Sequence, residues 1–371
     1  MDTVSMLIKP ASGSCNLRCR YCFYHDVSEK RTEHNFGFMS EETLELLIKE
    51  AFENAEKNIS FAFQGGEPML RGLPFFEKFI TYENKYMKSG VRAEHSIQTN
   101  ATLITEEWAD FFQKNHFLVG VSIDGRQMYH DRCRIYPDGS GSFETVKSSL
   151  SLLQKKGVET NALCVVTADI ARHPKAAYRG LKALGCRYIQ FIPCLDPLGE
   201  ERAALPFSLT PELYGTFLNS VFDLYYEDWK SGDYVSVRLF DDYIHLLVPE
   251  KAGACATAGT CGSYFVIEAD GSIYPCDFFV VDRFKMGQLG EQPLDELLRS
   301  PVSENFRKTG NAYPPACEGC KYLPLCNGGC RRDWTDDGRN YHCKAFQSFF
   351  SYAGPRLTRM AALERRFRRD L

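Results

Sequence analysis

The 371-residue sequence lacks any run of about twenty apolar residues, and its first residues, Met1 to Val4, do not begin a signal peptide. It also lacks an excess of basic residues, because 48 aspartates and glutamates outnumber 44 lysines and arginines. The net charge of −4 provides no basic field that would attract nucleic acid. We therefore expect a cytoplasmic protein that has neither membrane nor nucleic acid among its partners. We also expect a monomer, although no feature of the sequence determines the oligomeric state.

Cysteine, in contrast, is abundant, with 15 residues in the chain. The cytosol keeps thiols reduced, so disulfide bonds explain this number poorly. Metal binding explains it better, and an oxygen-sensitive cluster protein that works under reducing conditions would fit. Four cysteines fall outside the motifs described below, and we expect them to be structural: Cys133, Cys164, Cys186 and Cys194.

Three cysteines, Cys15, Cys19 and Cys22, lie close together directly behind a short apolar run over 5–10. On a loop that leaves a strand, three thiolates could bind three irons of a 4Fe-4S cube and leave the fourth iron without a protein ligand. That open iron would be available to a substrate or cofactor. A zinc ion held by this triplet and a distant fourth ligand is the alternative.

Apolar runs alternate with segments of helical spacing through the first half of the chain. Strands are predicted to end near residues 10, 64, 100, 124, 167 and 193, with helices over 72–88, 105–115, 143–156 and 173–184. Another helix is predicted to begin after Ser40, whose side chain can cap it. Buried strands separated by helices pair in parallel, so these six units predict an α/β fold with a partial (β/α)6 TIM-type barrel.

From Cys255 onward the periodicity weakens, and glycine and cysteine become prominent. This change indicates a second domain, which is cysteine-rich and needs a metal core because it lacks an apolar one. We place the barrel at 1–235, including a connecting helix from about 208, and the second domain with a C-terminal helix at 236–371.

Polar residues and glycines stand at the predicted strand ends, where barrel enzymes carry their chemistry. Because parallel strands end on the same side, we expect these groups to face one mouth. They are the cysteine loop, Gly65-Gly66-Glu67, Gln98-Thr99-Asn100, Ser122-Ile123-Asp124 and Cys194-Leu195-Asp196.

The C-terminal part contains eight further cysteines in one array. Eight thiolates complete two four-cysteine sites, the number that two fully ligated 4Fe-4S clusters require. Two zinc sites would need the same number, so the spacing alone leaves both metals open. The array consists of Cys255, Cys261, Cys276, Cys317, Cys320, Cys326, Cys330 and Cys343.

The C-x3-C-x2-C spacing, followed by Phe23, resembles the radical S-adenosylmethionine (SAM) superfamily, and the C-terminal array resembles its SPASM domain. In that superfamily, SAM gives a 5′-deoxyadenosyl radical that abstracts hydrogen from the substrate. The resemblance implies SAM and three 4Fe-4S clusters as cofactors. It assigns the SAM-binding cluster to Cys15, Cys19 and Cys22, one auxiliary cluster to Cys255, Cys261, Cys276 and Cys330, and the other to Cys317, Cys320, Cys326 and Cys343.

Nearly end to end, the chain looks most like the anaerobic sulfatase-maturating enzymes. Such enzymes oxidise a cysteine or serine of a sulfatase to Cα-formylglycine, and nothing in the sequence decides between these targets. The implied partners are a sulfatase polypeptide and an electron donor such as a flavodoxin or ferredoxin. The longest stretches that carry the resemblance are Phe61-Ala62-Phe63-Gln64-Gly65-Gly66-Glu67-Pro68, Leu163-Cys164-Val165-Val166-Thr167 and Tyr274-Pro275-Cys276-Asp277-Phe278.

The resemblance also implies roles for individual residues. Tyr21, Gly66, Ser122, Arg134 and Leu195 would contact SAM. A glycine at a strand end lets the backbone approach the SAM amino group, an arginine can pair with its carboxylate, and a leucine offers apolar surface to the adenine.

Asp277 matches the base proposed for this family, which takes the proton from the substrate thiol or hydroxyl. A carboxylate suits this task if burial raises its pKa toward neutrality. Tyr24 and Gln64 match positions near the substrate. The auxiliary cluster next to Asp277, through Cys276, would accept the surplus electron.

Two other functions are open at this point. One is a radical SAM/SPASM enzyme that crosslinks or epimerises another ribosomal peptide. Such enzymes usually carry an N-terminal domain for a leader peptide, and the position of Cys15 so near the start argues against one. The other is a non-catalytic iron–sulfur or zinc protein, which would have little need for a six-unit barrel with an open cluster.

Overall fold

The structure is a computed structural model that describes residues 1–248, 250 and 252–369. It contains six longer strands, β1 (Thr3–Ile8), β2 (Asn58–Phe63), β3 (Arg92–Thr99), β4 (Phe117–Ser122), β5 (Thr160–Val166) and β6 (Tyr188–Pro193). The shorter strands are β7 (Ser236–Val237), β8 (Phe265–Ile267), β9 (Ser272–Tyr274), β10 (Gly287–Gln288), β11 (Trp334–Thr335) and β12 (Arg339–Asn340).

The first ten of these strands form one sheet, in the order β10-β9-β8-β1-β2-β3-β4-β5-β6-β7. Each strand from β1 to β6 pairs in parallel with the next, as the sequence predicts. Strands β7 and β10 are the two edges, so the sheet stays open and the predicted partial barrel is confirmed.

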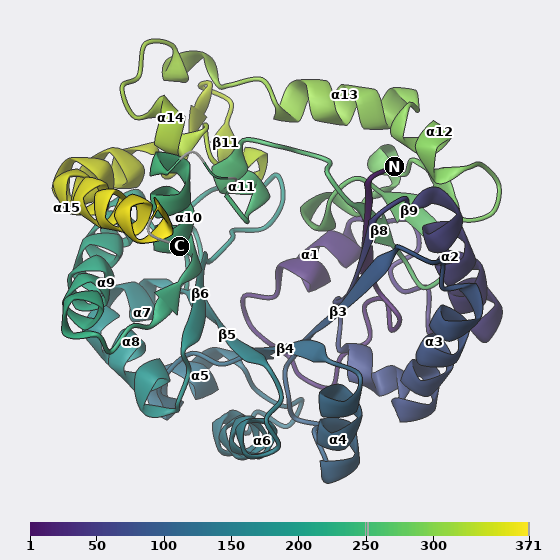
Figure 1. The fold of residues 1–371 in the computed structure, drawn as a ribbon. Helices are drawn as coiled ribbons and strands as arrows, with labels where there is room; N and C mark the ends of the chain where they lie inside the picture. The colour runs from purple at the N-terminus through teal and green to yellow at the C-terminus, as the bar shows by residue number, and fades with distance from the viewer. Residues whose placement is uncertain (249, 251, 370–371) are drawn as a thin grey trace.

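Helices cover the outside of this sheet and form a ring around the strands (Figure 1). None of the described helices is both long and apolar enough to cross a membrane. The barrel helices are α1 (Phe23–Glu29), α2 (Glu41–Asn54), α3 (Leu73–Tyr86), α4 (Glu106–Lys114), α5 (Gln127–Cys133), α6 (Phe143–Lys155), α7 (Ala168–Arg172), α8 (Pro174–Ala183) and α9 (Pro211–Ser231). The later helices are α10 (Arg238–Leu247), α11 (Cys255–Ala258), α12 (Leu294–Leu298), α13 (Pro301–Gly310), α14 (Leu323–Cys326) and α15 (Cys343–Arg369).

Helix α2 shows how local sequence sets these elements. The Ser40 side chain accepts a hydrogen bond from the Thr43 amide and caps the helix, as predicted. Leu44, Leu47 and Ile48 recur at helical spacing and are fully buried against the sheet.

The C-terminal part is joined to the barrel through the sheet itself. Strand β8 pairs in parallel with β1, so that Met6 lies opposite Phe265 and Ile8 opposite Ile267. The long helix α15 packs against α9 on the other side of the molecule (Figure 1). The β1–β8 pairing brings the residues that follow β8 and β9 close to the carboxyl end of β1.

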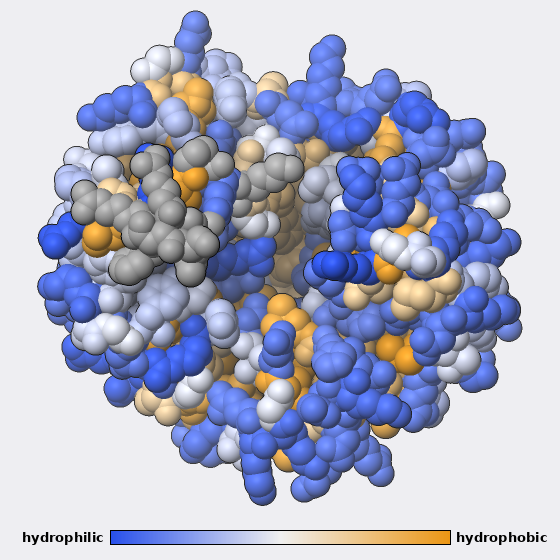
Figure 2. Space-filling view, in the orientation of Figure 1, coloured by the Kyte–Doolittle hydropathy of each residue, from blue (hydrophilic) through white to orange (hydrophobic). Residues whose placement is uncertain are grey.

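The two faces of the sheet differ in burial. Phe61 and Phe63 on β2 are fully buried and pack edge-on against Phe79 of α3. Their neighbours Ser60 and Ala62 point to the opposite face, toward the interior of the barrel, and are half-buried. Figure 2 shows a hollow near the centre of the molecule. Side chains therefore leave space inside this barrel, unlike the packed interior of a closed eight-stranded one.

His95 on β3 is half-buried and lies beside the buried carboxylate of Glu83. Its Nε2 lies 2.9 Å from Glu83 Oε2 on α3, and its Nδ1 lies 3.1 Å from the Asn115 carbonyl oxygen. Burial by itself would lower the pKa of His95, but the hydrogen bond and the charge of Glu83 outweigh burial and raise that pKa above its ordinary value. Folding therefore favours the protonated ring.

Stability should consequently depend on pH through His95. A raised folded pKa gives stabilisation that is complete below the unfolded pKa of about 6.5 and is lost as pH rises through the folded value. We expect His95→Gln to lower the free energy of unfolding by about 2 kcal/mol at pH 6, and by less at pH 9. Anaerobic urea unfolding of both proteins measures this difference. A cost that grows with pH would contradict the assignment.

Candidate active site

The cysteine loop follows β1 and ends at Cys22, which precedes the first residue of α1. The Arg18 amide donates to the Ile135 carbonyl (2.7 Å) and the Arg20 amide to the Cys133 carbonyl (3.0 Å). These bonds attach the loop to the segment after α5. The thiols of Cys15, Cys19 and Cys22 interact electrostatically with one another, so the loop gathers them as the motif predicts.

The glycine turn after β2, Gly65-Gly66-Glu67, packs against the cysteine loop at Ser14. Gly66 has φ of +53°, and a side chain there would collide with the Ser14 carbonyl oxygen. The next residue, Glu67, is fully buried, and its carboxylate accepts bonds from the Asn100 amide (2.7 Å) and the Thr99 hydroxyl (2.8 Å). Burial raises the pKa of Glu67 to about 7. Glu67 thus fastens the turn to the end of β3.

Gly66→Ala should therefore damage the loop more than an ordinary glycine substitution. The left-handed backbone alone costs about 1 kcal/mol, and the collision with Ser14 adds about 2 kcal/mol of unfolding free energy. The matched control is Gly37→Ala, because Gly37 also has positive φ (+74°) but has nothing within 4 Å of an added Cβ. Urea unfolding should show the larger loss of stability in the first variant, and SAM binding by equilibrium dialysis should be impaired in that variant only. Equal effects in both would show that the Ser14 contact is unimportant.

A second group of residues gathers around Asp124, beyond the end of β4. Asp124 is fully buried and accepts hydrogen bonds from the Tyr21 hydroxyl (2.6 Å) and from Arg134 Nε (2.9 Å). Burial would raise the pKa of Asp124, but the Arg134 guanidinium outweighs it and holds the pKa below its usual range. The structure thus brings together Tyr21 and Arg134, two of the residues assigned to SAM, through Asp124, which the sequence placed at the mouth without a role of its own.

The other residues assigned to SAM lie at neighbouring strand ends. Ser122 at the end of β4 accepts a hydrogen bond from Gln98 Nε2 (2.8 Å). Leu195 lies just beyond β6 and is half-buried. Asn100 after β3 donates to Asn16 of the cysteine loop (2.8 Å). The carboxyl ends of the parallel strands therefore share one side, which is the mouth that the sequence predicts.

Asp277 lies in a short turn directly after Cys276 and is 4% exposed. One carboxylate oxygen forms an ion pair with Lys9 Nζ, and the other accepts a hydrogen bond from Gln64 Nε2 (2.8 Å). Lys9 follows β1 and Gln64 follows β2, so the carboxylate stands at the rim of the barrel. The pairing of β8 with β1 is what brings Asp277 there.

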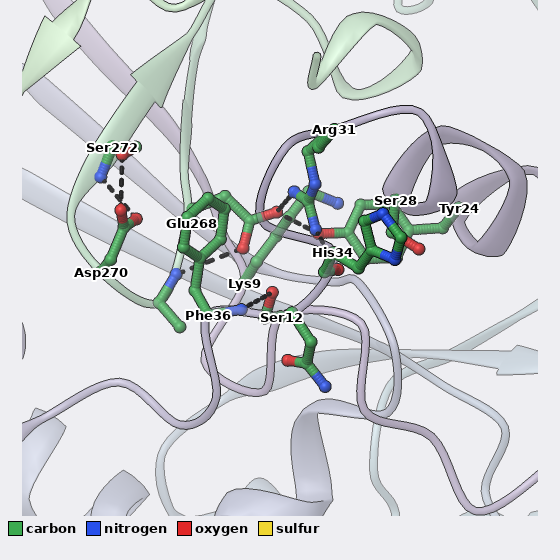
Figure 3. Close-up of polar contacts among 12 residues, drawn as sticks. Lys9, Ser12, Tyr24, Ser28, Arg31, His34, Phe36, Glu268, Asp270 and Ser272 are labelled. Atoms are coloured by element: carbon green, nitrogen blue, oxygen red, sulfur yellow. Dashed lines mark hydrogen bonds and ion pairs between the residues drawn. The ribbon is translucent and has the colours of Figure 1, made fainter. Parts of the chain in front are cut away.

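Next to Asp277 lies a cluster of buried polar side chains, shown in Figure 3. Lys9 Nζ lies 3.7 Å from the centroid of the Tyr24 ring, and the Tyr24 hydroxyl donates to Glu268. Arg31 Nη1 also donates to Glu268 Oε1, at 2.7 Å. Tyr24, which the sequence placed near the substrate, thus has its hydroxyl engaged by a buried carboxylate.

Sequence reasoning missed Lys9, Glu268 and Arg31 as members of the site. Two of them carry a signal that could have found them, since Lys9 and Glu268 each directly follow an apolar strand. A charge at such a position belongs to the strand end where barrels carry their chemistry. Arg31 lies in a loop beyond α1 and has no such signal.

The eight C-terminal thiols separate into two groups. The electrostatic interactions between them link Cys255 with Cys261, Cys276 and Cys330, and separately link Cys317, Cys320, Cys326 and Cys343. This grouping coincides with the one that the SPASM resemblance implies.

The cysteines form the donor set for the metal groups that the sequence implies. All 15 cysteines are free of disulfide bonds. Across 1–248, 250 and 252–369, no three His, Cys, Asp or Glu side chains converge closely enough to hold one metal ion. The free thiols supply the type of ligand that iron–sulfur clusters require.

Similarity to known proteins extends over both parts of the chain. Residues 10–170 match the family model of the radical SAM superfamily, and residues 255–321 match that of an iron–sulfur cluster-binding domain, SPASM. A cysteine-type anaerobic sulfatase-maturating enzyme of Clostridium novyi is 44% identical over 368 residues, which are 97% of this chain and 98% of the relative. A serine-type anaerobic sulfatase-maturating enzyme of Bacteroides thetaiotaomicron is 35% identical, over 94% of this chain and 89% of the relative.

A solved structure, native anSMEcpe with bound AdoMet and Cp18Cys peptide, matches with a TM-score of 0.92 and 41% identity over 97% of this chain and 99% of that chain. The likeness therefore covers the barrel, the cysteine loop and the C-terminal cysteine array together. On these grounds the chain belongs to the anaerobic sulfatase-maturating enzymes, which are radical SAM enzymes with SAM and 4Fe-4S clusters as cofactors.

Proposed function

We propose that the chain oxidises a cysteine of a sulfatase polypeptide to Cα-formylglycine. The observation that carries this proposal is the position of Asp277, a buried carboxylate next to Cys276 at the rim of the barrel. Cysteine is favoured over serine as the target because identity to the cysteine-type relative, 44%, exceeds identity to the serine-type relative, 35%.

The cofactors would be held by the residues that the sequence singled out. Cys15, Cys19 and Cys22 would bind the SAM-binding cluster, and the two groups of C-terminal cysteines would each bind an auxiliary cluster. When bound, SAM and the clusters supply a radical that takes hydrogen from the substrate Cβ and an acceptor for the electron left behind. Five residues would contact SAM, with Arg134 held in place by Asp124: Tyr21, Gly66, Ser122, Arg134 and Leu195.

The protein's own part in the reaction is to remove a proton. Asp277 would accept the proton of the substrate thiol, while Gln64 keeps the carboxylate oriented through its bond to Oδ2. Loss of this proton, one Cβ hydrogen atom and one electron oxidises the carbon–sulfur group to a thioaldehyde. Water then adds to this carbon and hydrogen sulfide leaves, which gives the aldehyde. The ring of Tyr24 would lie near the substrate peptide, since its hydroxyl is bonded to Glu268.

The decisive experiment is an anaerobic incubation of reconstituted protein with reductant, SAM and a peptide that carries the sulfatase sequence Cys-x-Pro-x-Arg. Oxidation to the aldehyde lowers the mass of a cysteine peptide by about 18 units and that of a serine peptide by about 2, with 5′-deoxyadenosine formed alongside. We expect faster conversion of the cysteine peptide. Deoxyadenosine without any change in peptide mass would instead favour an enzyme for another ribosomal peptide.

We further propose a flavodoxin- or ferredoxin-type electron donor, a cytoplasmic location and a monomeric state. The 15 cysteines without a disulfide support a reducing compartment. An electron carrier is needed because no protein side chain supplies the electron that starts each SAM cleavage.

A further inference from the structure

Lys9 is the one cation in contact with the Asp277 carboxylate among the ion pairs of the described residues. It follows the last residue of β1, and its amide donates to the Ile267 carbonyl of β8 (2.8 Å). The side chain is fully buried. Its position is thus fixed by the same strand pairing that brings Asp277 to the rim.

The surroundings of Lys9 leave its ammonium little freedom. A Cβ on Gly65 would lie 2.8 Å from both Cγ and Nζ of Lys9, so only glycine allows the side chain to pass. On another side, the Tyr24 ring lies 3.7 Å from Nζ, in cation–π contact. Figure 3 shows Lys9 beside Tyr24, Arg31 and Glu268. The ammonium can therefore hold Asp277 in one geometry.

The stability of the fold does not require the buried ion pair of Lys9 and Asp277. Burying an ammonium and a carboxylate removes both from water, and an apolar pair of similar size is often as stable. Tyr24 is itself held by its bond to Glu268, which Arg31 neutralises at 2.7 Å. The cluster thus contains two buried cations and two buried anions, and within it Lys9 pairs with Asp277. The four charged residues are Lys9, Arg31, Glu268 and Asp277.

The two oxygens of Asp277 have different partners, Lys9 on Oδ1 and Gln64 on Oδ2. Contacts at both oxygens fix the plane of the carboxylate, while a carboxylate still has further lone pairs that can accept a proton. We propose that Lys9 is a positioning residue that holds the Asp277 carboxylate toward the substrate thiol. This inference rests on the proposed function of Asp277 as the base.

The test compares Lys9→Met with wild type, using two products of the same reaction. If Lys9 positions Asp277, deoxyadenosine should still form, while aldehyde formed per deoxyadenosine should fall about a hundredfold, as expected when a reacting group is displaced. Lys9→Arg keeps a positive charge and should recover part of the yield. A structural defect alone would lower both products together, and that result would overturn the proposal.

A double-mutant cycle shows whether Lys9 acts through Asp277. In an Asp277→Asn background, Lys9→Met should cause no further loss of aldehyde per deoxyadenosine, because residues that act as one unit are not additive. Additive losses would overturn the proposal. If Lys9→Met forms no folded protein, the same cycle is measured with Lys9→Arg.

Lys57→Met is the matched control, because it removes a lysine that pairs with an aspartate, Asp2 at 3.0 Å, on the exposed surface and not at Asp277. It should leave the product ratio near the wild-type value. If aldehyde per deoxyadenosine is normal in Lys9→Met but low in Asp277→Asn, the proposal for Lys9 is wrong and the proposed function of Asp277 stands. Normal ratios in both would instead remove Asp277 as the base, so the two failures are distinguishable.

Discussion

Replacing Cys15 by alanine should abolish the cleavage of SAM. Cys15 leads the loop whose three thiols would hold the SAM-binding cluster, and its Sγ accepts a hydrogen bond from the Leu17 amide (3.4 Å). A cluster that has already one open iron has no spare protein ligand, so loss of one thiolate removes the cluster from this loop. We expect no detectable deoxyadenosine in anaerobic assays by liquid chromatography. The iron content should fall by about a third, because two of three clusters remain.

Cys133→Ala is the matched control for this variant. Cys133 is half-buried beside the loop, and its contact with the loop is made by its carbonyl oxygen, which accepts from the Arg20 amide (3.0 Å). Alanine keeps that carbonyl, so the control should retain both iron and SAM cleavage. Cleavage at the wild-type rate in Cys15→Ala would show that this triplet does not form the SAM site.

The barrel could be predicted from the sequence because each of its units carries a local signal. A helix was predicted over 143–156 and α6 occupies Phe143–Lys155; likewise 173–184 contains α8 at Pro174–Ala183. Buried parallel strands must be apolar, and each is followed by a helix that covers it. The cysteine loop and the glycine turn were found for the same reason, since strand ends are visible where apolar runs stop.

The contacts around Asp277 could not be predicted in this way. They depend on β8, a strand of three residues that is too short to show periodicity and pairs with β1 more than 250 residues earlier in the chain. The resemblance identified Asp277 itself, and Lys9 stands at a strand end, but their ion pair emerges only from this long-range pairing. The bond between Asp124 and Arg134 was also not predicted. Two buried charges are tolerated only as a pair, but the sequence does not show which charged residues become buried together.

The second large effect is expected from Asp277→Asn, which keeps the shape of the side chain and removes its ability to accept a proton. The substrate thiol would then lose its main proton acceptor, and general base catalysis contributes about a hundredfold to ten-thousandfold. Tyr21 and Arg134, which we propose as SAM contacts, belong to the separate group around Asp124 and should be undisturbed. We therefore expect aldehyde formation to fall by at least about a hundredfold while deoxyadenosine continues to form.

Asp282→Asn separates this effect from a general loss of negative charge in the same region. Asp282 accepts hydrogen bonds from the Thr32 amide (2.9 Å) and hydroxyl (2.6 Å), and neither bond involves Asp277. Its replacement should leave the aldehyde yield near wild type. A normal yield in Asp277→Asn would mean that the proton leaves by another route, while family membership, which rests on the whole chain, would be unaffected. If Asp277→Asn, and not Asp282→Asn, forms deoxyadenosine without aldehyde, hydrogen abstraction and proton removal depend on different parts of the mouth. Hydrogen abstraction then depends on the cysteine loop, and proton removal depends on the rim where β8 meets β1.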